Sequence, residues 1–398
     1  MKIRPAVTTA TATFGLLAAA FATTTAGAAA SPPGSHHKIQ RLTVLQPRYD
    51  EGVRPSIARS GGASKASAPS IPLFHSTVTD GATTFPYAMV GKNPFTAHAN
   101  GAANVKTVIV PVVVKLTNGD TFNPTVADSC APSSSVTRML KSPIFTSKAY
   151  TWGGKKVGTG QYVSVFRRAE FWQQTRPAGL NPDLQVNLVP TKTKRLTVTV
   201  PTAASAEGSI SCGNIAAMEI SWWDNEVQTV LMPKLAARGF GSDSFPIFVL
   251  SNVVEYDTTP ANCCILGYHN AFTNPADGGT TTYGTAMYDN THNALAGVKD
   301  ISVLSHEVAE WMDDPLVNGV DNNTNPWGNI GQVSGCQTNL EVGDPLSGTL
   351  QNTRLAGRTW HPQELAFFSW FYHQNPSIGI NHWYSSNGTF TAAAAACP

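Results

Sequence analysis

The sequence has 398 residues, of which 42% are hydrophobic and only 13% are charged. This apolar content is enough for a sizeable core and excludes a disordered chain, and the length allows two or three domains. Lys and Arg together number 27 against 25 acidic residues, with no basic stripe, so nucleic acid is not expected as a partner. The low charge, with 33 Gly and 27 Pro, is typical of a loop-rich, partly β, extracellular protein.

Residues 1–28 have the layout of a secretory signal peptide. Lys2 and Arg4 supply the positive start, residues 14–22 form a short apolar run, and small residues follow. The run is shorter than the about 20 residues that cross a bilayer, and no other stretch approaches that length, so no membrane span is expected. The sequence therefore predicts a secreted, extracellular protein, and removal of Lys2 and Arg4 changes the net charge from +2 to 0.

Two segments are predicted after the signal peptide. Residues 29–101 are rich in Ser, Ala, Gly and Pro and poor in aromatic residues, which predicts a weakly ordered extension or pro-segment. Residues 102–398 are predicted to form the compact domain.

The hydrophobic patterns of the compact domain predict a mixture of strands and helices, and hence an α+β fold. The predicted strands are 105–116, 196–200, 246–254, 265–269 and 280–288, and the predicted helices are 162–172, 224–238 and 300–314. Pro111 interrupts the first strand and indicates an edge strand or a bulge. Pro233 indicates a kink in the second helix.

The six cysteines are Cys130, Cys212, Cys263, Cys264, Cys336 and Cys397. An even number in an exported chain predicts a disulfide-stapled fold, and the absence of a CxxC spacing argues against a thiolate zinc site. Cys263 and Cys264 are expected to reach different partners, because adjacent cysteines rarely bridge each other.

The predicted helix 300–314 contains the most informative motif, His306-Glu307-Val308-Ala309-Glu310. On a helix, His306 and Glu310 lie one turn apart on the same face, about 5–6 Å from each other, which suits two ligands of one metal ion. Glu307 is rotated by about 100° and would lie beside that ion. The apolar residues of the helix gather on the opposite side, as a core-facing stripe does.

This motif resembles the HExxH helix of zinc metallopeptidases, with Glu310 in place of the second histidine. The resemblance implies a zincin-like α+β fold, in which a twisted sheet with an antiparallel edge strand precedes the metal helix and the third ligand follows it. It also implies that Glu307 acts as general base.

The third ligand is expected in the segment that follows. Glu341 comes 31 residues after Glu310 and is the preferred candidate, Asp344 is the alternative, and His361 and His382 come next. The combination of a His-Glu helix and a later Glu-x-Gly-Asp also resembles secreted proteins of the phosphate-induced (exordium-like) type and related bacterial hypothetical proteins. That second resemblance implies nothing definite about activity.

The predicted ligands have consequences for the metal. Two histidines and one carboxylate leave zinc with one net positive charge, whereas His306, Glu310 and Glu341 leave it with none. A less positive metal lowers the pKa of its bound water less. Carboxylate-rich ligation also tolerates harder ions, so the expected cofactor is Zn²⁺ or another divalent ion such as Mn²⁺ or Ca²⁺.

The sequence thus predicts a secreted metal-dependent hydrolase, most directly a zinc peptidase acting on a peptide or protein substrate. The alternative is a non-catalytic extracellular protein, associated with cell wall or glycan, with a structural metal or none. The aromatic segment 367–372 is read as a core element, or otherwise as a platform for a sugar or peptide. The segment 321–325 is read as a solvated turn rather than a calcium loop.

Overall fold

The computed structural model describes residues 39–47, 70–95, 102–175, 186–274, 278–317 and 340–395, together with the backbone of 327–329 and 335–337. The predicted signal peptide (1–28) and the segment 321–325 lie outside the described residues. Residues Lys38–Pro398 form one compact unit. Within the described part of the chain, no helix combines the length and the apolar character that crossing a bilayer requires.

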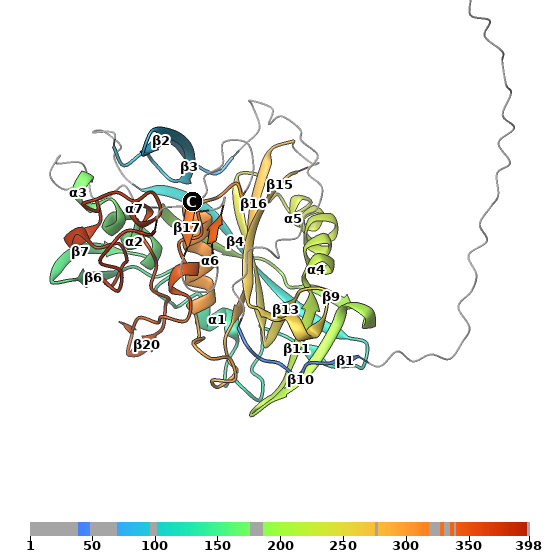
Figure 1. The fold of residues 1–398 in the computed structure, drawn as a ribbon. Helices are drawn as coiled ribbons and strands as arrows, with labels where there is room; N and C mark the ends of the chain where they lie inside the picture. Colours follow the sequence, from blue (N-terminus) through green and yellow to red (C-terminus); the bar gives the residue numbers. More distant parts are fainter. Residues whose placement is uncertain are drawn as a thin grey trace, which may run out of the picture. The chain divides into compact units, whose positions relative to one another are not determined.

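A seven-stranded sheet organises the unit, and the fold is mixed α+β (Figure 1). Its strands are, in order, β15 (Gly267–Thr273), β16 (Thr280–Tyr288), β12 (Ser244–Ser251), β4 (Ala103–Leu116) and β5 (Thr121–Phe122), with β8 (Val186–Lys192) and β9 (Leu196–Val200) also paired with β4. Strands β4, β12 and β16 run parallel, whereas β15 pairs antiparallel with β16. Among the described strands, β15 therefore ends the sheet.

Of the two alternatives predicted for residues 105–116, an edge strand or a bulge, the edge strand is wrong, because β4 lies inside the sheet. It pairs with β12 on one side and with β8 and then β9 on the other. The β8 ladder ends opposite Ile109 and the β9 ladder begins opposite Val112. Pro111 falls between the two ladders. Proline has no amide proton to donate, and at this position no ladder hydrogen bond requires one.

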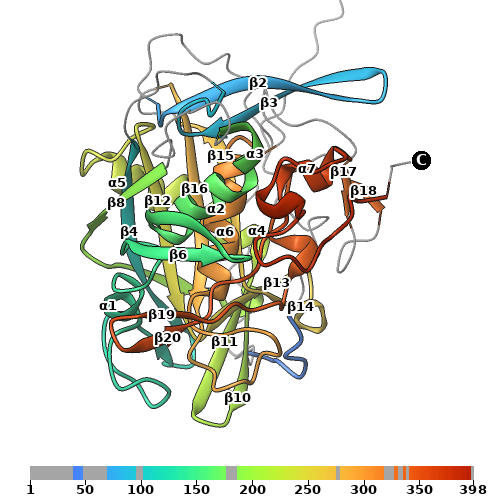
Figure 2. The same ribbon diagram turned by 90° about the vertical axis from the view of Figure 1, so that its left-hand side faces the viewer.

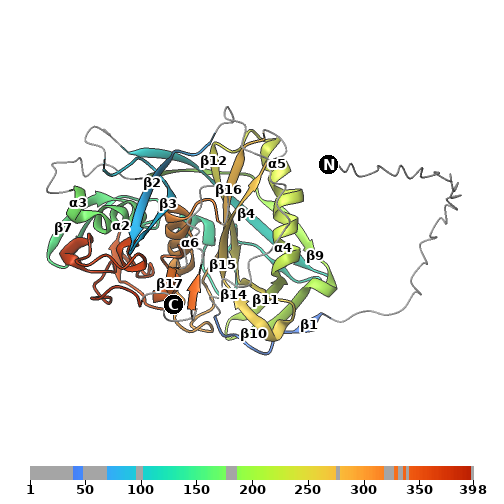
Figure 3. The same ribbon diagram turned by 45° about the horizontal axis from the view of Figure 1, so that its top comes forward.

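Helices cover both faces of the sheet (Figures 1 and 3). One face carries α4 (Ile220–Glu226), a π-helical turn (Val227–Leu231) and α5 (Met232–Ala236), which together replace the predicted helix 224–238 and have Pro233 in the first turn of α5. The other face carries α2 (Tyr162–Glu170) and α6 (Ser302–Asp313). Residues of β4 alternate between the two cores, as a strand buried on both faces requires.

Several predicted elements are confirmed, namely 162–172 by α2, 196–200 by β9, 280–288 by β16 and 300–314 by α6. The predicted strand 246–254 is divided into β12 and β13 (Val253–Tyr256), which belong to different sheets. Asn252 separates them with a φ of 53°, a left-handed conformation that cannot continue a strand. The predicted strand 265–269 is likewise divided between β14 (Cys263–Ile265) and β15.

The remaining elements surround this sheet. A second sheet contains β1 (Gln40–Arg41), β10 (Ser205–Ile210), β11 (Gly213–Glu219), β13 and β14. Two-stranded ribbons are formed by β2 (Leu73–Asp80) with β3 (Thr83–Val90), β6 (Lys148–Trp152) with β7 (Lys155–Gly160), β17 (Trp327–Asn329) with β18 (Gly335–Gln337), and β19 (Thr353–Leu355) with β20 (Arg358–Trp360). Short helices are α1 (Ser135–Met139), α3 (Trp172–Thr175) and α7 (Phe368–Phe371), with 3₁₀ turns at Thr202–Ala204, Pro260–Asn262, Asp344–Leu346 and Ile380–His382.

Part of the segment expected to be a weakly ordered extension is folded. The β2–β3 hairpin lies within residues 29–101, and Tyr87, Met89 and Val90 of β3 are buried in the same core as α6. Figure 2 shows the hairpin above α2 and α7. Strand β1 also falls in this segment and pairs with β10. The folded unit therefore begins well before residue 102.

Two disulfides are present among the described cysteines. Cys130 and Cys212 are joined across a separation of 82 residues, which staples the loop before α1 to the β10–β11 turn. Cys263 and Cys264 are joined to each other, so the prediction of separate partners is wrong. That prediction rested on the strain expected when adjacent cysteines bridge each other. The peptide between them is cis, and their Cα atoms lie 3.0 Å apart. The Cys336 side chain and Cys397 lie outside the described residues.

Candidate metal centre

Helix α6 is held in a defined rotation by its apolar side. Trp311 stacks on Phe245 of β12 with ring centroids 3.7 Å apart, and its indole N–H donates to Thr282 Oγ1 at 2.9 Å. His306, Glu307 and Glu310 are also buried, but they lie against β15 and the segment 340–344 instead. The helix thus brings the motif residues next to an edge strand and a later loop.

The imidazole of His306 has a defined orientation and tautomer. The Gln363 side-chain amide donates to the Gly343 carbonyl oxygen at 2.6 Å, so its own oxygen faces His306 Nδ1 at 3.1 Å. Because an amide oxygen only accepts, Nδ1 carries a proton. Nε2 then points at two carboxylates, 3.0 Å from Glu310 Oε1 and 3.3 Å from Asp344 Oδ1.

Gly343 allows the segment 340–344 to approach the helix this closely. A Cβ at this position would lie 2.6 Å from Cγ and Nδ1 of His306, so the backbone lies directly against the ring. The Gly343 amide also donates to Glu310 Oε1 at 3.1 Å. Asp344 begins the 3₁₀ turn that follows, which places its carboxylate beside His306 Nε2.

The site is strongly negative. Burial by itself would lower the pKa of His306, but the negative charges of Glu310, Asp344 and Glu307 outweigh it and raise this pKa well above the ordinary value. In the absence of a metal ion, a proton at Nε2 would therefore balance part of the negative charge. A divalent cation can replace that proton.

His269 of β15 is a functional candidate that sequence reasoning missed. Its Nδ1 lies 3.8 Å from Glu310 Oε2, 3.8 Å from Glu341 Oε2 and 3.9 Å from Glu307 Oε2. Its Nε2 lies 3.1 Å from the backbone carbonyl oxygen of Asp314. A single histidine at the end of a short predicted strand has no motif spacing that would mark it as a ligand.

The donor atoms of the described residues form two groups, each within 4.8 Å, that share Glu310. One group is His306, Glu310 and Asp344, and the other is His269, Glu310 and Glu341. The alternative ligand Asp344, rather than the preferred Glu341, therefore stands with His306. Glu341 lies three residues earlier, on the side of β15.

The two remaining ligand candidates have other partners. His361 Nδ1 lies 2.9 Å from Asp300 Oδ2, and His382 Nδ1 lies 2.8 Å from the Ser377 carbonyl oxygen. Neither residue belongs to the two donor groups.

The geometry of the first group fits a metal ion. Tetrahedral zinc with bonds of about 2.0–2.1 Å places its donors about 3.3 Å apart. The separations from His306 Nε2 to Glu310 and Asp344, 3.0 and 3.3 Å, are close to that value. Donation of Nδ1–H to a fixed acceptor is also the usual arrangement of a metal-binding histidine.

Asp313 completes the acidic end of α6 but has a structural partner. Arg167 of α2 donates to Asp313 Oδ1 at 2.5 Å and to the Met312 carbonyl oxygen at 2.9 Å. Burial, followed by the charge of Asp313, raises the pKa of neighbouring Glu170 well above its ordinary value. This buried cluster ties α2 to α6 and sets the position of α6.

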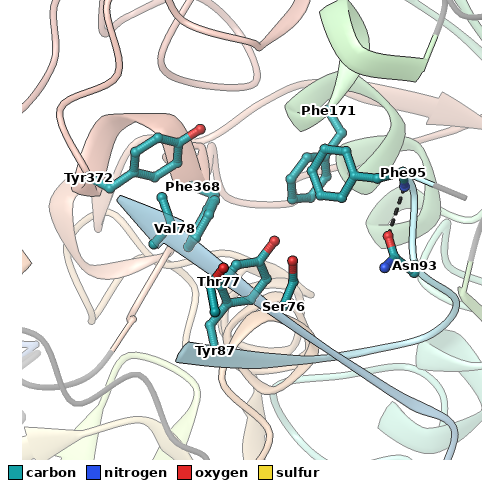
Figure 4. Close-up of a pocket in the computed structure, with 9 residues that line it drawn as sticks. All are labelled: Ser76, Thr77, Val78, Tyr87, Asn93, Phe95, Phe171, Phe368 and Tyr372. Carbon is teal, nitrogen blue, oxygen red and sulfur yellow. Dashed lines mark hydrogen bonds between the residues drawn. The ribbon is translucent and has the colours of Figure 1, made fainter. Parts of the chain in front are cut away.

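The aromatic segment 367–372 is mainly core, as predicted, since Phe367 to Phe371 are buried. Phe368 and Tyr372 also line a cavity of about 320 Å³ with residues of the β2–β3 region and with Phe171, which follows α2 (Figure 4). The complete lining is Ser76, Thr77, Val78, Tyr87, Asn93, Phe95, Phe171, Phe368 and Tyr372. No lining residue belongs to either donor group, so the cavity is separate from the candidate metal centre.

Comparison of the chain with protein-family models, with curated proteins and with solved structures gave no match.

Proposed function

We propose that this chain is a secreted metal-dependent hydrolase, most directly a zinc peptidase. The observation that carries the proposal is the convergence of His306 Nε2, Glu310 Oε1 and Asp344 Oδ1, with the histidine tautomer fixed by Gln363. Helix and loop together offer three donors to one ion, which is the number a catalytic zinc site needs when its fourth position is left for water.

The surrounding fold supports a zincin-like arrangement. In zincin-type peptidases an antiparallel edge strand precedes the metal helix and a further ligand follows it. Here β15 pairs antiparallel with β16 at the end of the described sheet, α6 follows, and Asp344 comes after α6. The Cys130–Cys212 disulfide supports an oxidising, extracellular location.

In this proposal Glu307 is the general base. It is next to His306 on α6 and is 6% exposed, and its carboxylate lies 3.9 Å from His269 Nδ1 at the same cluster. A bound divalent ion would polarise the scissile carbonyl and acidify a water molecule. Glu307 would take the proton of that water and deliver it to the leaving amine. Gln363 would keep His306 in its ligating tautomer throughout.

The ligand charges suggest the working pH. His306, Glu310 and Asp344 would leave a divalent ion with no net local charge, so its water would be less acidic than in a site with two histidines. We therefore expect activity that increases toward alkaline pH, with Zn²⁺ or Mn²⁺ as the active ion.

The test compares purified mature protein with its Glu307→Gln variant on unstructured protein and peptide substrates. The variant should retain metal and lose at least about 100-fold in turnover, because general-base catalysis contributes at least that much. Glu226→Gln, on α4 across the sheet, is the matched control and should keep full activity. Unchanged turnover in Glu307→Gln would reject the base, and loss of metal would make Glu307 a ligand.

The aromatic cavity favours a second candidate function, non-catalytic binding of a wall glycan. Phe368 and Tyr372 have ring centroids 4.6 Å apart, and Ser76, Thr77 and Asn93 add polar groups to the lining. Sugars bind to such combinations of aromatic faces and hydrogen-bonding groups. Titration with soluble cell-wall glycan fragments should then give binding that Tyr372→Ala weakens and Glu307→Gln does not.

A further inference from the structure

Glu310 lies between two histidines from different elements. Its Oε1 is 3.0 Å from His306 Nε2, and its Oε2 is 3.8 Å from His269 Nδ1. A carboxylate can give one oxygen to each of two ions, whereas a histidine at the same position would offer one nitrogen to one ion. Glu310, which stands at the position of the second histidine of HExxH, can therefore bind a second ion.

The tautomer of His269 presents a ligand nitrogen to the cluster. The Asp314 carbonyl oxygen can only accept, so His269 Nε2 carries the proton and the neutral ring has its lone pair on Nδ1. Metal-binding histidines show this same donation from the second nitrogen to a backbone carbonyl. His269 and His306 are thus both oriented toward the carboxylates, one through Nδ1 and the other through Nε2.

The distances around His269 fit an ion better than they fit direct hydrogen bonds. Nδ1 lies 3.8 to 3.9 Å from oxygens of Glu307, Glu310 and Glu341. Hydrogen bonds between nitrogen and oxygen are about 2.7–3.2 Å long. A separation of 3.8 Å between two donors corresponds to metal–donor distances of about 2.3 Å in a tetrahedral site, slightly longer than zinc bonds and at the short end of calcium bonds.

The cluster also carries enough negative charge for two divalent cations. Four carboxylates lie within 4 Å of a histidine nitrogen, and they are buried: Glu307 (6% exposed), Glu310 (3%), Glu341 (1%) and Asp344 (4%). Buried charges are normally paired or coordinate metals. Two divalent ions carry a positive charge equal to the negative charge of four carboxylates.

Asp344 provides an independent indication of the first ion, on which the second site depends. Its Oδ1 lies beside His306, while its buried Oδ2 has no hydrogen-bond partner among the described residues. Buried carboxylate oxygens normally have partners. A metal ion beside Asp344 would supply the missing one.

We propose that the protein binds a second divalent metal ion through His269, Glu310 and Glu341, adjacent to the ion of His306, Glu310 and Asp344, with Glu310 bridging the two. This inference rests on the proposed function for the first ion. Bridged hydrolase sites hold their metals about 3.5–4 Å apart. Glu341 and Asp344, which sequence reasoning treated as competitors for one position, would then each serve a different ion.

The test is the zinc stoichiometry of the full mature protein after removal of metal by a chelator. Calorimetric titration with Zn²⁺ and elemental analysis should give two equivalents. His269→Ala and Glu341→Gln should each bind one equivalent, with an unchanged circular dichroism spectrum. His269→Gln serves as a second variant if the alanine variant does not fold. His361→Ala is the matched control, because this His–Asp pair lies outside the cluster, and it should keep two equivalents.

The possible results separate this inference from the proposed function. One equivalent in the wild type that His269→Ala leaves unchanged would overturn the second site and leave the hydrolase proposal intact. Two equivalents that persist in His269→Ala would also overturn it, since the second ion would lie elsewhere. The absence of any bound zinc would overturn both. With Co²⁺, bridged ions should couple magnetically, so the paramagnetic resonance signal should fall at the second equivalent, whereas a doubled signal would exclude the Glu310 bridge.

Discussion

Gly343→Ala is the most selective perturbation of the candidate metal centre. Gly343 has φ −85° and ψ −37°, a conformation that alanine adopts without strain. The substitution therefore acts through the added methyl group alone. The three atoms nearest to that methyl group would all belong to the ring of His306.

The expected effect follows from the distances. The new Cβ would lie 2.6 Å from Cγ and Nδ1 of His306 and 2.8 Å from Cε1, whereas carbon contacts relax near 3.5–4.0 Å, so ring or loop must move by about 1 Å. Metal sites tolerate deviations of about 0.2 Å in ligand distance. We expect zinc affinity at the His306 site to fall by about 10–100-fold or more, which is the size of effect when a ligand is misplaced by its support.

Zinc titration of the wild type, Gly343→Ala and Gly284→Ala measures this effect. Gly284 is the matched control, a glycine of β16 whose Cβ would meet Phe245 at an ordinary 3.4 Å. It should bind zinc as the wild type does. If two ions bind, Gly343→Ala should weaken the site of His306 and spare that of His269. Wild-type affinity in Gly343→Ala would refute the assignment of His306 as a ligand.

Two further predictions concern stability, both measured by urea unfolding. Burial raises the pKa of Glu255 to about 8, so between pH 4.5 and 8 the native state keeps a proton that the unfolded state releases, and stability falls as pH rises. Glu255→Gln keeps an acceptor for Thr285 and removes this effect, so its stability relative to wild type should increase by about 3 kcal/mol from pH 5 to pH 7.5; a pH-independent difference would contradict the shift. Arg167→Met leaves Asp313 buried without its guanidinium partner and should lower the free energy of unfolding by about 3–5 kcal/mol, whereas exposed Arg354→Met should change it little. A loss below about 1 kcal/mol in Arg167→Met would show that the pair is not buried as described.

The sequence predicted elements well where local pattern and tertiary environment agree. Helix α6 was placed to within two residues because its period of 3.6 is clear in the sequence. Strand β4 was found but misplaced in the sheet. Pro111 locally favours an edge, and only the succession of β8 and β9 along β4 makes it acceptable inside. That succession is a property of the whole sheet.

The β2–β3 hairpin was missed for a different reason. The composition of residues 29–101 as a whole is that of a weakly ordered segment, and averaging over it conceals the hairpin. The signal was nevertheless present, since Gly81 stands first in the two-residue turn Gly81-Ala82, a favoured position for glycine in a hairpin, and the turn lies between two runs that are rich in Thr, Val and aromatic residues. Composition is a weaker guide than turn chemistry at this length scale.

Part of the candidate metal centre could be predicted from local sequence spacing, and the rest depends on tertiary contacts. His306, Glu307 and Glu310 were found because one helix turn brings them together, and this spacing is written in the sequence. The choice between Glu341 and Asp344 beside His306 depends on how Gly343 packs against the ring, together with Gln363 from a more distant segment. Neither contact can be derived from sequence spacing.

His269 required knowledge of the sheet order. Along β15, side chains alternate between faces, and Tyr268 points to the α4 side, where its hydroxyl donates to Asp224 at 2.9 Å. His269 must then face the opposite side, which α6 covers. This deduction becomes possible only once β15 is known to pair with β16 and α4 and α6 are known to cover different faces. Alternation along β15 thus determines the face to which His269 points. The order of the sheet and its helices then determines that Glu310 of α6 lies next to it.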